Sequence, residues 1–298
     1  MSSIIKILDK SKILKLNEVH PENSQYKIIY IDVVHRCNME CANCYLPNRD
    51  YEDIPVEKIN SFVDKFTHKT EFRLIGGEPT LHNDLAEIIR NITQNPLRHR
   101  VVLVTNGLKL ASYKYLKSLT LAGLKYVYIS MNGFNNDEIY KKVDNLACAK
   151  IKMLALHNCQ KENMVISIGF IIIKHVNEYL IPEMKIYFKN YKQIINFEFR
   201  NIGTIGRNAV EDQNAENYEF DQIKEIIFKE FQMSDVNVIQ YDQYSLLCKT
   251  NRFFIHLHNW TNLPNGFDKK TNQRRGRMTE NFLVAPFLEH IVKNEGFY

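Results

Sequence analysis

The sequence contains no long run of apolar residues, and this absence sets the first limit on the class of protein. Of its 298 residues, 45% are hydrophobic and 24% are charged, which supports a packed core and excludes disordered, collagen-like and coiled-coil proteins. The longest apolar runs, such as residues 166–173, are far shorter than the roughly 20 residues of a membrane-spanning helix. The first residues also lack the apolar stretch and cleavage site of a secretion signal. We therefore predict no membrane span and a cytoplasmic protein.

Cysteine is scarce as well, with six residues in the chain. Disulfides are not expected in the cytoplasm, so the spacing of the cysteines matters more than their even number. Three of them, Cys37, Cys41 and Cys44, form a CxxxCxxC pattern directly after a strand-like run. Thiolates are ligands for zinc and for iron–sulfur clusters. This loop is therefore the first candidate metal site.

Two kinds of metal site fit three converging thiolates. An iron–sulfur cube takes four ligands, commonly four thiolates, so three cysteines leave one iron open to an external ligand, as a catalytic metal keeps one position free. The alternative is a zinc site with His35 or another histidine as the fourth ligand. Zinc sites usually show two separated pairs of ligands, and no second pair accompanies this loop. The spacing favours the cluster and leaves zinc open.

Short β-branched runs alternate with amphipathic stretches through the middle of the chain. This alternation predicts an α/β fold of strand–helix units with right-handed crossovers and a parallel sheet. Six units either close partly into a barrel or lie open as a doubly wound sheet, and periodicity alone does not choose. The predicted strands are 27–35, 71–74, 101–105, 126–130, 164–173 and 195–200, and the predicted helices are 56–67, 84–94, 112–121, 137–154, 179–191 and 220–231.

The pattern changes after residue 231. Residues 236–241 and 252–258 are predicted strands, and residues 286–293 a short apolar helix. This segment is too short for more than a marginal core of its own, so we expect it to pack on the strand–helix units. The predicted parts are an N-terminal segment (1–26), a strand–helix domain (27–231) and a C-terminal α/β extension (232–298).

Small polar groups recur where the predicted strands end. The second strand ends in Gly76-Gly77-Glu78-Pro79, the third in Thr105-Asn106-Gly107 and the fourth in Ser130-Met131-Asn132-Gly133. Glycines permit close approach of the backbone, and Glu78 would place a carboxylate above the sheet edge. Each motif alone is a common turn. Because the carboxyl ends of parallel strands meet at one edge, the series predicts a ligand site across that edge.

Together these motifs resemble the radical SAM superfamily: CxxxCxxC after the first strand, GGEP after the second, TNG after the third and SxNG after the fourth. The resemblance implies a partial (β/α)6 barrel of the TIM type. It also implies a [4Fe-4S] cluster held by Cys37, Cys41 and Cys44, with S-adenosylmethionine (SAM) chelating the open iron. One electron from a flavodoxin- or ferredoxin-type donor would then cleave SAM to a 5′-deoxyadenosyl radical, which abstracts a substrate hydrogen.

The resemblance further implies roles for the strand-end residues. The amino group of SAM would meet Gly76, Gly77 and the Glu78 side chain. The ribose would meet the fourth strand end. A GRNA stretch after the sixth strand is similar to one in many peptide-modifying members, so two arginines would reach the SAM carboxylate or the substrate, or else form structural ion pairs. The predicted cofactor-binding residues are Tyr45, Gly76, Gly77, Glu78, Pro79, Thr105, Asn106, Ser130, Asn132, Arg200 and Arg207.

The leading hypothesis is a single-cluster radical SAM enzyme acting on a peptide or amino-acid-like substrate. The alternative is a nucleotide or sugar whose phosphates meet the basic residues at 269–277, which otherwise form a solvated loop. A zinc-stabilised nucleic-acid-binding module is the candidate from another class, but it has no use for the strand-end motifs. The expected partners are thus a small-molecule or peptide substrate and an electron donor, without nucleic acid or membrane.

Two observations concern the C-terminal half. Only Cys248 lies beyond Cys159, so no extension carrying further clusters is expected, and both cysteines are predicted to be inert thiols, with a hydrogen-atom donor as the alternative. His256, His258 and Trp260 alternate on one predicted strand face. A core or edge face explains this alternation as well as a substrate pocket does.

Overall fold

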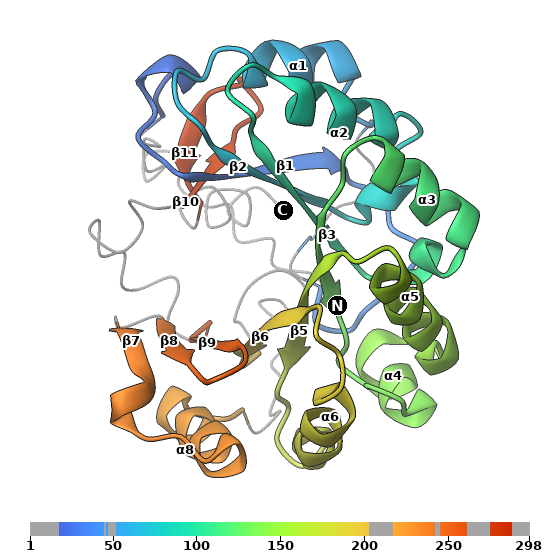
Figure 1. Ribbon diagram of the computed structural model, residues 1–298, viewed down its shortest axis with the longest axis vertical. Helices are drawn as coiled ribbons and strands as arrows, with labels where there is room; N and C mark the ends of the chain where they lie inside the picture. The colour runs from blue at the N-terminus through green and yellow to red at the C-terminus, as the bar shows by residue number, and fades with distance from the viewer. Residues whose placement is uncertain are drawn as a thin grey trace, which may run out of the picture.

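An eleven-stranded sheet organises the part of the chain that the computed structural model describes, which comprises residues 18–44, 46, 52–202, 217–241, 245–260 and 275–287. In sheet order its strands are β11 (Val284–Pro286), β10 (Arg275–Met278), β1 (Ile28–Val34), β2 (Glu71–Gly76), β3 (Arg100–Thr105), β4 (Tyr126–Ser130), β5 (Val165–Ile171), β6 (Ile194–Arg200), β9 (Phe254–His258), β8 (Ser245–Lys249) and β7 (Val238–Tyr241). The sheet curves into an open arc with the helices on its outer side (Figure 1). Within these residues, no helix has the length and apolar character needed to cross a bilayer.

The six predicted strands form the centre of this sheet. Strands β1 to β6 are neighbours in chain order, and each adjacent pair is parallel. The predicted α/β fold with a partial barrel is therefore confirmed, and the sheet does not close. The helices are α1 (Val56–Val63), α2 (Leu85–Gln94), α3 (Tyr113–Leu121), α4 (Asp137–Asp144), α5 (Ala149–Lys161), α6 (Ile181–Phe188) and α8 (Phe220–Phe231).

Helix α2 illustrates how the sequence directs these helices onto the sheet. Its buried residues are Leu85, Ile88, Ile89 and Ile92, a spacing that places them on one face of an α-helix. Strand β1 is buried along nearly its whole length, as expected for a parallel strand covered on both faces. The apolar faces of helices and strands therefore meet in the main core, between the sheet and the helices on its outer side (Figure 1).

One predicted helix, 137–154, is wrong because the chain forms two helices there. Helix α4 ends at Asp144, and the next residue, Asn145, adopts a left-handed conformation with φ of 54°. Helix α5 begins at Ala149. Asparagine tolerates this backbone region better than most residues. The break brings Asp144 to within 3.8 Å of Lys152 on α5.

The segment after residue 231 extends the sheet at both edges. Strand β9 pairs in parallel with β6, and β10 pairs in parallel with β1, while β8, β7 and β11 add antiparallel pairs outside them. The predicted strands at 236–241 and 252–258 correspond to β7 and β9, but β8, β10 and β11 were not predicted. The predicted helix at 286–293 lies, except for its first two residues, outside the described part of the chain.

A buried ion pair links β10 to β1. The guanidinium of Arg277 donates two hydrogen bonds of 2.6 Å to the carboxylate of Asp32, and the two residues are 2% and 7% exposed. The expectation that the basic residues at 269–277 form a solvated loop is therefore wrong for Arg277. Its charge is already satisfied by an acid from the opposite end of the sequence.

We expect the Arg277→Met substitution to lower the free energy of unfolding by about 3–5 kcal/mol, because it leaves the Asp32 carboxylate buried without its guanidinium partner. Urea denaturation of the cluster-free chain measures the change. The matched control is Arg100→Met, which removes an ion pair with Glu71 in which the arginine side chain is 48% exposed and should cost less than about 1 kcal/mol. Equal losses in the two variants would contradict the structural role of Arg277.

Candidate active site

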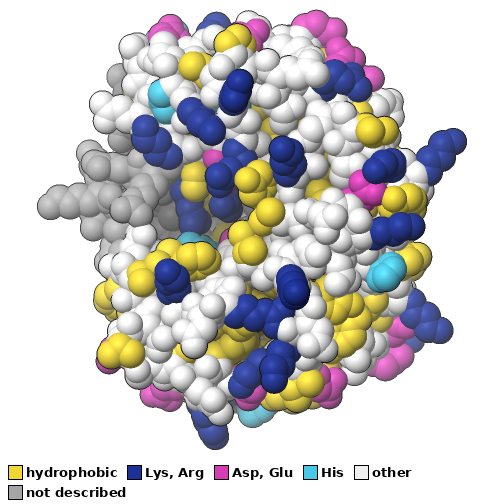
Figure 2. Space-filling view, in the orientation of Figure 1, with side chains coloured by type: hydrophobic (Ala, Val, Ile, Leu, Met, Phe, Trp, Pro, Cys, Tyr) yellow, Lys and Arg dark blue, Asp and Glu magenta, His cyan; other side chains and the backbone are white. Residues whose placement is uncertain are grey.

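A cavity of about 160 Å³ lies at the carboxyl ends of β2 to β6, beside the cysteine loop. Glu78 and Pro79 are not among its lining residues, and Tyr45 and Arg207 lie outside the residues that the structure describes. Figure 2 views the molecule in the orientation of Figure 1, and lysine and arginine side chains are scattered over the face it shows, among patches of hydrophobic side chains. The predicted residues that line the cavity are Cys37, Cys41, Cys44, Gly76, Gly77, Thr105, Asn106, Ser130, Asn132 and Arg200.

The two glycines after β2 pack directly on the start of the cysteine loop. The N–H of Gly77 donates to the carbonyl of Val34 over 2.8 Å. A Cβ at Gly77 would lie 2.3 Å from the carbonyl oxygens of both His35 and Arg36, and one at Gly76, whose φ is +126°, would lie 2.0 Å from that of Val34. Only glycine permits such an approach. The glycines therefore set the position of the cysteine loop over the sheet edge.

Glu78 joins three segments at this edge. Its side chain is fully buried, and Oε1 accepts hydrogen bonds from the Thr80 N–H (3.1 Å), the Thr80 hydroxyl (2.6 Å) and the Thr105 hydroxyl (2.6 Å). Oε2 accepts from the Asn106 N–H over 2.7 Å. The Glu78 N–H donates to the carbonyl of Arg36. Glu78 thus fixes the ends of β2 and β3 and the cysteine loop relative to one another.

Asn106 extends this contact to the cysteines. Its side-chain amide donates to Oδ1 of Asn38 over 2.8 Å and lies 4.0 Å from the Sγ of Cys37. Its Oδ1 accepts from the Leu108 N–H, which fixes the orientation of the amide. The third strand end therefore contacts the loop at Cys37 and Asn38, in addition to the contacts of the glycines.

The wall at the end of β4 is held by a buried polar network. The Asn132 amide donates to Oδ1 of Asp144 and accepts from the Ile171 N–H, each over 3.0 Å. Lys152 donates to the carbonyl of Ser130 over 2.8 Å and lies 3.8 Å from Oδ2 of Asp144. Because both charged groups are almost fully buried, each needs the other. The network keeps Ser130 and Asn132 at the cavity.

Asp144 and Lys152 line the cavity but were not predicted. Lys152 falls on the buried face of α5, in step with Ala149, Ala155 and Cys159. A lysine at an apolar helix position is the signal that marks a buried cation with an acidic partner. Asp144 carries no comparable signal, because one aspartate within the predicted helix 137–154 is expected on the solvent-exposed face.

The environment of Cys41 opposes a free thiolate. Burial raises the pKa of the Cys41 thiol well above its ordinary value, the nearby carboxylate of Asp144 raises it further, and Lys152 acts in the opposite direction. The proton therefore stays on sulfur until a metal replaces it, as metal binding to thiols generally requires. A site of this kind takes up metal with release of a proton.

The residues present fit an iron–sulfur cluster with one open iron. Three thiols from one loop line the cavity. Among the described residues that line it, Asp144 is the one further carboxylate, and it already forms an ion pair with Lys152 and accepts a hydrogen bond from Asn132. A single zinc ion would draw its sulfurs to about 3.8 Å, given Zn–S bonds of about 2.3 Å. Among the described residues, the group whose ligand atoms all lie within 4.8 Å of one another is a different one, on β6 and β9. The thiols are thus spaced more widely than the ligands of one ion.

Arg200 closes the cavity at the end of β6. Its guanidinium lies 4.4 Å from the centre of the Trp260 ring, and the Trp260 N–H donates to Oδ1 of Asn201. A stacked arginine of this kind is held in place by cation–π attraction. It presents a positive charge to a ligand in the cavity.

The remaining cysteines are buried away from solvent. Burial raises the pKa of Cys148 to about 11 and that of Cys159 to about 12, and it also raises the pKa of Cys248. At neutral pH all three are therefore protonated thiols. None of them lines the cavity in the described part of the chain.

The open parallel sheet and the three thiols beside its cavity are typical of enzymes that hold a metal cluster at one end of a partial barrel. Comparison of the sequence with protein families gives the same answer: the model of the radical SAM superfamily matches residues 31–184, more than half of the chain. The protein belongs to the radical SAM superfamily. Its members use a [4Fe-4S] cluster and SAM, so the protein is a radical SAM enzyme with these cofactors.

Named relatives differ in their reactions. The chain is 29% identical to the GTP 3′,8-cyclase of Aquifex aeolicus over 188 residues. This aligned stretch covers 60% of this chain and 58% of the relative. It is 31% identical to the 7,8-dihydro-6-hydroxymethylpterin dimethyltransferase of Methanocaldococcus jannaschii over 139 residues. That stretch covers 44% of this chain and 27% of the relative. The chain thus spans little more than half of the first relative and about a quarter of the second.

Solved structures share the fold. SuiB of Streptococcus suis bound to S-adenosylmethionine matches with a TM-score of 0.63 at 13% identity, over 88% of this chain and 60% of SuiB. The structure of native anSMEcpe with bound AdoMet and Cp18Cys peptide matches with a TM-score of 0.52 at 20% identity, over 69% of this chain and 58% of anSMEcpe. At these identities the likeness concerns the fold alone.

We expect the Gly77→Ala substitution to displace the cysteine loop, because the added Cβ would lie 2.3 Å from two carbonyl oxygens. Iron bound per chain after anaerobic reconstitution should fall to less than about half of the wild-type value, since carbonyls of the backbone cannot move aside as side chains do. The control is Ser118→Ala on the exposed face of α3, and a circular dichroism spectrum shows whether each variant is folded. A folded Gly77→Ala chain with full iron content would contradict this role of the glycine.

Proposed function

We propose that the protein cleaves SAM at the cavity beside Cys37, Cys41 and Cys44 and uses the resulting radical on a peptide or amino-acid-like substrate. The observation that carries this proposal is that the three thiols and the Gly76-Gly77 turn line one cavity. When bound there, a [4Fe-4S] cluster would supply one electron to SAM and generate the 5′-deoxyadenosyl radical. The electron would come from a flavodoxin- or ferredoxin-type protein.

The residues around the cavity have distinct tasks in this proposal. The backbone of Gly76 and Gly77 offers polar groups to the amino group of SAM, while Glu78 acts by fixing the turn, since its oxygens already accept bonds from the protein. Ser130 and Asn132 face the ribose, held by the Asp144–Lys152 pair. Such preorganisation matters because a radical must meet its substrate hydrogen in one geometry.

Arg200 would bind the carboxylate of SAM or of the substrate. Its guanidinium lines the cavity and is positioned by Trp260. A carboxylate is the group that guanidinium recognises with two parallel hydrogen bonds. This preference supports an amino-acid-like substrate as readily as SAM itself.

Two observations bear on the substrate class. A peptide substrate is supported by the fold shared with SuiB, for which a structure with the precursor peptide SuiA is known. A nucleotide is the second candidate, because a GTP 3′,8-cyclase is among the relatives. Against the nucleotide, Arg277 of the basic segment is engaged with Asp32 and does not offer its charge to a phosphate.

We expect the anaerobically reconstituted protein to form 5′-deoxyadenosine when it is given dithionite and SAM, as measured by chromatography with mass detection. In the Cys41→Ala variant the rate of 5′-deoxyadenosine formation should be lower by at least about 100-fold, because the cluster then lacks one of its three protein ligands. Cys248→Ala is the matched control, since its thiol is fully buried on β8 away from the cavity. Cleavage that survives in Cys41→Ala would refute the assignment of the cluster loop.

Deuterium transfer distinguishes the two substrate classes. The reconstituted protein is incubated with SAM and either a fully deuterated peptide digest or deuterated GTP, and the 5′-deoxyadenosine is analysed by mass spectrometry. A peptide substrate predicts deuterium in the product from the digest and none from GTP, because the radical takes the atom directly from its substrate. Deuterium from GTP alone would establish the nucleotide instead.

A further inference from the structure

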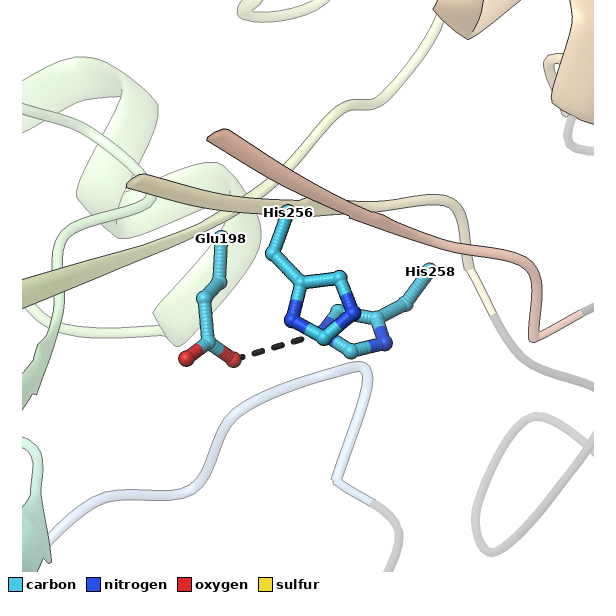
Figure 3. A group of neighbouring side chains, drawn as sticks. All are labelled: Glu198, His256 and His258. Atoms are coloured by element: carbon cyan, nitrogen blue, oxygen red, sulfur yellow. Dashed lines mark ion pairs between the residues drawn. The ribbon is translucent and has the colours of Figure 1, made fainter. Parts of the chain in front are cut away.

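Three side chains that are possible metal ligands meet on the inner wall of the arc. The carboxylate of Glu198 and the imidazoles of His256 and His258 each offer one ligand atom, and these atoms all lie within 4.8 Å of one another. Figure 3 shows the carboxylate and the two rings turned toward one another from neighbouring strands. The Nε2 of His258 is 3.3 Å from Oε2 of Glu198, and the two ring centres are 3.8 Å apart.

The strand register builds this group. Glu198 on β6 is directly opposite His256 on β9, and His258 follows two residues later on the same face of β9. The other face of β6 carries Phe197 and Phe199, whose rings pack against Phe231 of α8. The apolar face is thus turned to the helices, and the three polar groups are directed to the interior.

The distances suit one metal ion. Zinc binds imidazole nitrogen at about 2.0–2.1 Å and carboxylate oxygen at about 2.0–2.2 Å, which places neighbouring ligand atoms roughly 3.3–3.5 Å apart. The Glu198–His258 separation already has this value. The ligand atom of His256 lies within 4.8 Å of both. Two histidines and one carboxylate are a common ligand set for catalytic zinc and for non-haem iron.

The surroundings support coordination as well. The Asn196 amide donates to Oε1 of Glu198 over 2.8 Å, which orients the carboxylate as outer groups do in metal sites. Arg73, whose charge acts on Glu198, also forms an ion pair with Glu71.

The group borders the cavity described above. Glu198 is also opposite Gly169 on β5, and Gly169 lines the cavity, as does Arg200, two residues beyond Glu198 on the same face of β6. A Cβ at Gly169 would lie 1.9 Å from the Tyr128 hydroxyl, and Tyr128 also lines the cavity.

We propose that Glu198, His256 and His258 bind one divalent transition-metal ion of the zinc or iron(II) class, separate from the cysteine loop. Three protein ligands leave a further coordination position for water or for a polar substrate group. The ion would neutralise the charge of Glu198 in the interior and anchor an oxygen or nitrogen of the substrate beside the SAM cavity. The binding itself does not depend on the proposed function.

The test is zinc binding by the reconstituted protein. The chain is dialysed to equilibrium against limiting zinc, and zinc and iron are measured by elemental analysis. We expect one zinc per chain in addition to the cluster iron. His256→Ala and His258→Ala should each weaken zinc binding at least about 10- to 100-fold, the range seen even for groups that only orient ligands, with cluster iron unchanged. The matched control is His157→Ala on the exposed face of α5.

Two further variants separate this site from the cluster and from misfolding. In a Cys37→Ala, Cys41→Ala, Cys44→Ala chain the zinc should remain and should disappear when His256→Ala is added. Glu198→Gln keeps the size and a hydrogen-bond acceptor but removes the charge, so a folded chain with weakened zinc binding is expected. Zinc that follows the cysteines, or equal zinc in His258→Ala and the wild type, would overturn the proposal whatever the outcome of the SAM assay.

Discussion

The site depends on contact between two stretches of backbone, the Gly76-Gly77 turn and the first residues of the cysteine loop. The hydrogen bonds from Gly77 and Glu78 to the carbonyls of Val34 and Arg36 form only because no Cβ lies between the chains. Main-chain contacts of this kind are rigid, since neither partner has side-chain rotamers to lose. The ligand loop is therefore fixed to the same edge that would bind SAM, and Glu78 transmits this order to β3.

Much of the centre of the fold could be predicted from the sequence, because each of β1 to β6 is a local run of apolar residues followed by its own helix. The two edges could not. Strand β10 contains Arg275, Gly276 and Arg277 and has no alternating pattern, and it forms because β1 offers a free edge and Asp32 offers a charge 245 residues away. The break at Asn145 was likewise hidden, since one asparagine does not outweigh apolar residues on either side.

The candidate site divides in the same way. The cysteines and the strand-end residues could be predicted because each belongs to a short motif of neighbouring residues. Lys152 and Asp144 lie close together because the chain breaks between α4 and α5. Glu198 lies opposite His256 because of the register in which β6 pairs with β9. Predicting such groups requires the pairing of distant strands, which local periodicity does not contain. From the sequence, His256 and His258 could be placed on one face of a predicted strand, but Glu198 could not be identified as the third residue of the group.

The pairing of β10 with β1 and of β9 with β6 also affects how the chain reaches this structure. Until residues 254–278 have left the ribosome, the outer backbone groups of β1 and β6 have no strand beside them, and unpaired edges of parallel strands readily join other chains. Contacts between residues so far apart in sequence also form slowly. The growing chain is thus most exposed to misassociation late in synthesis, when six strands are complete and their outer neighbours are still missing.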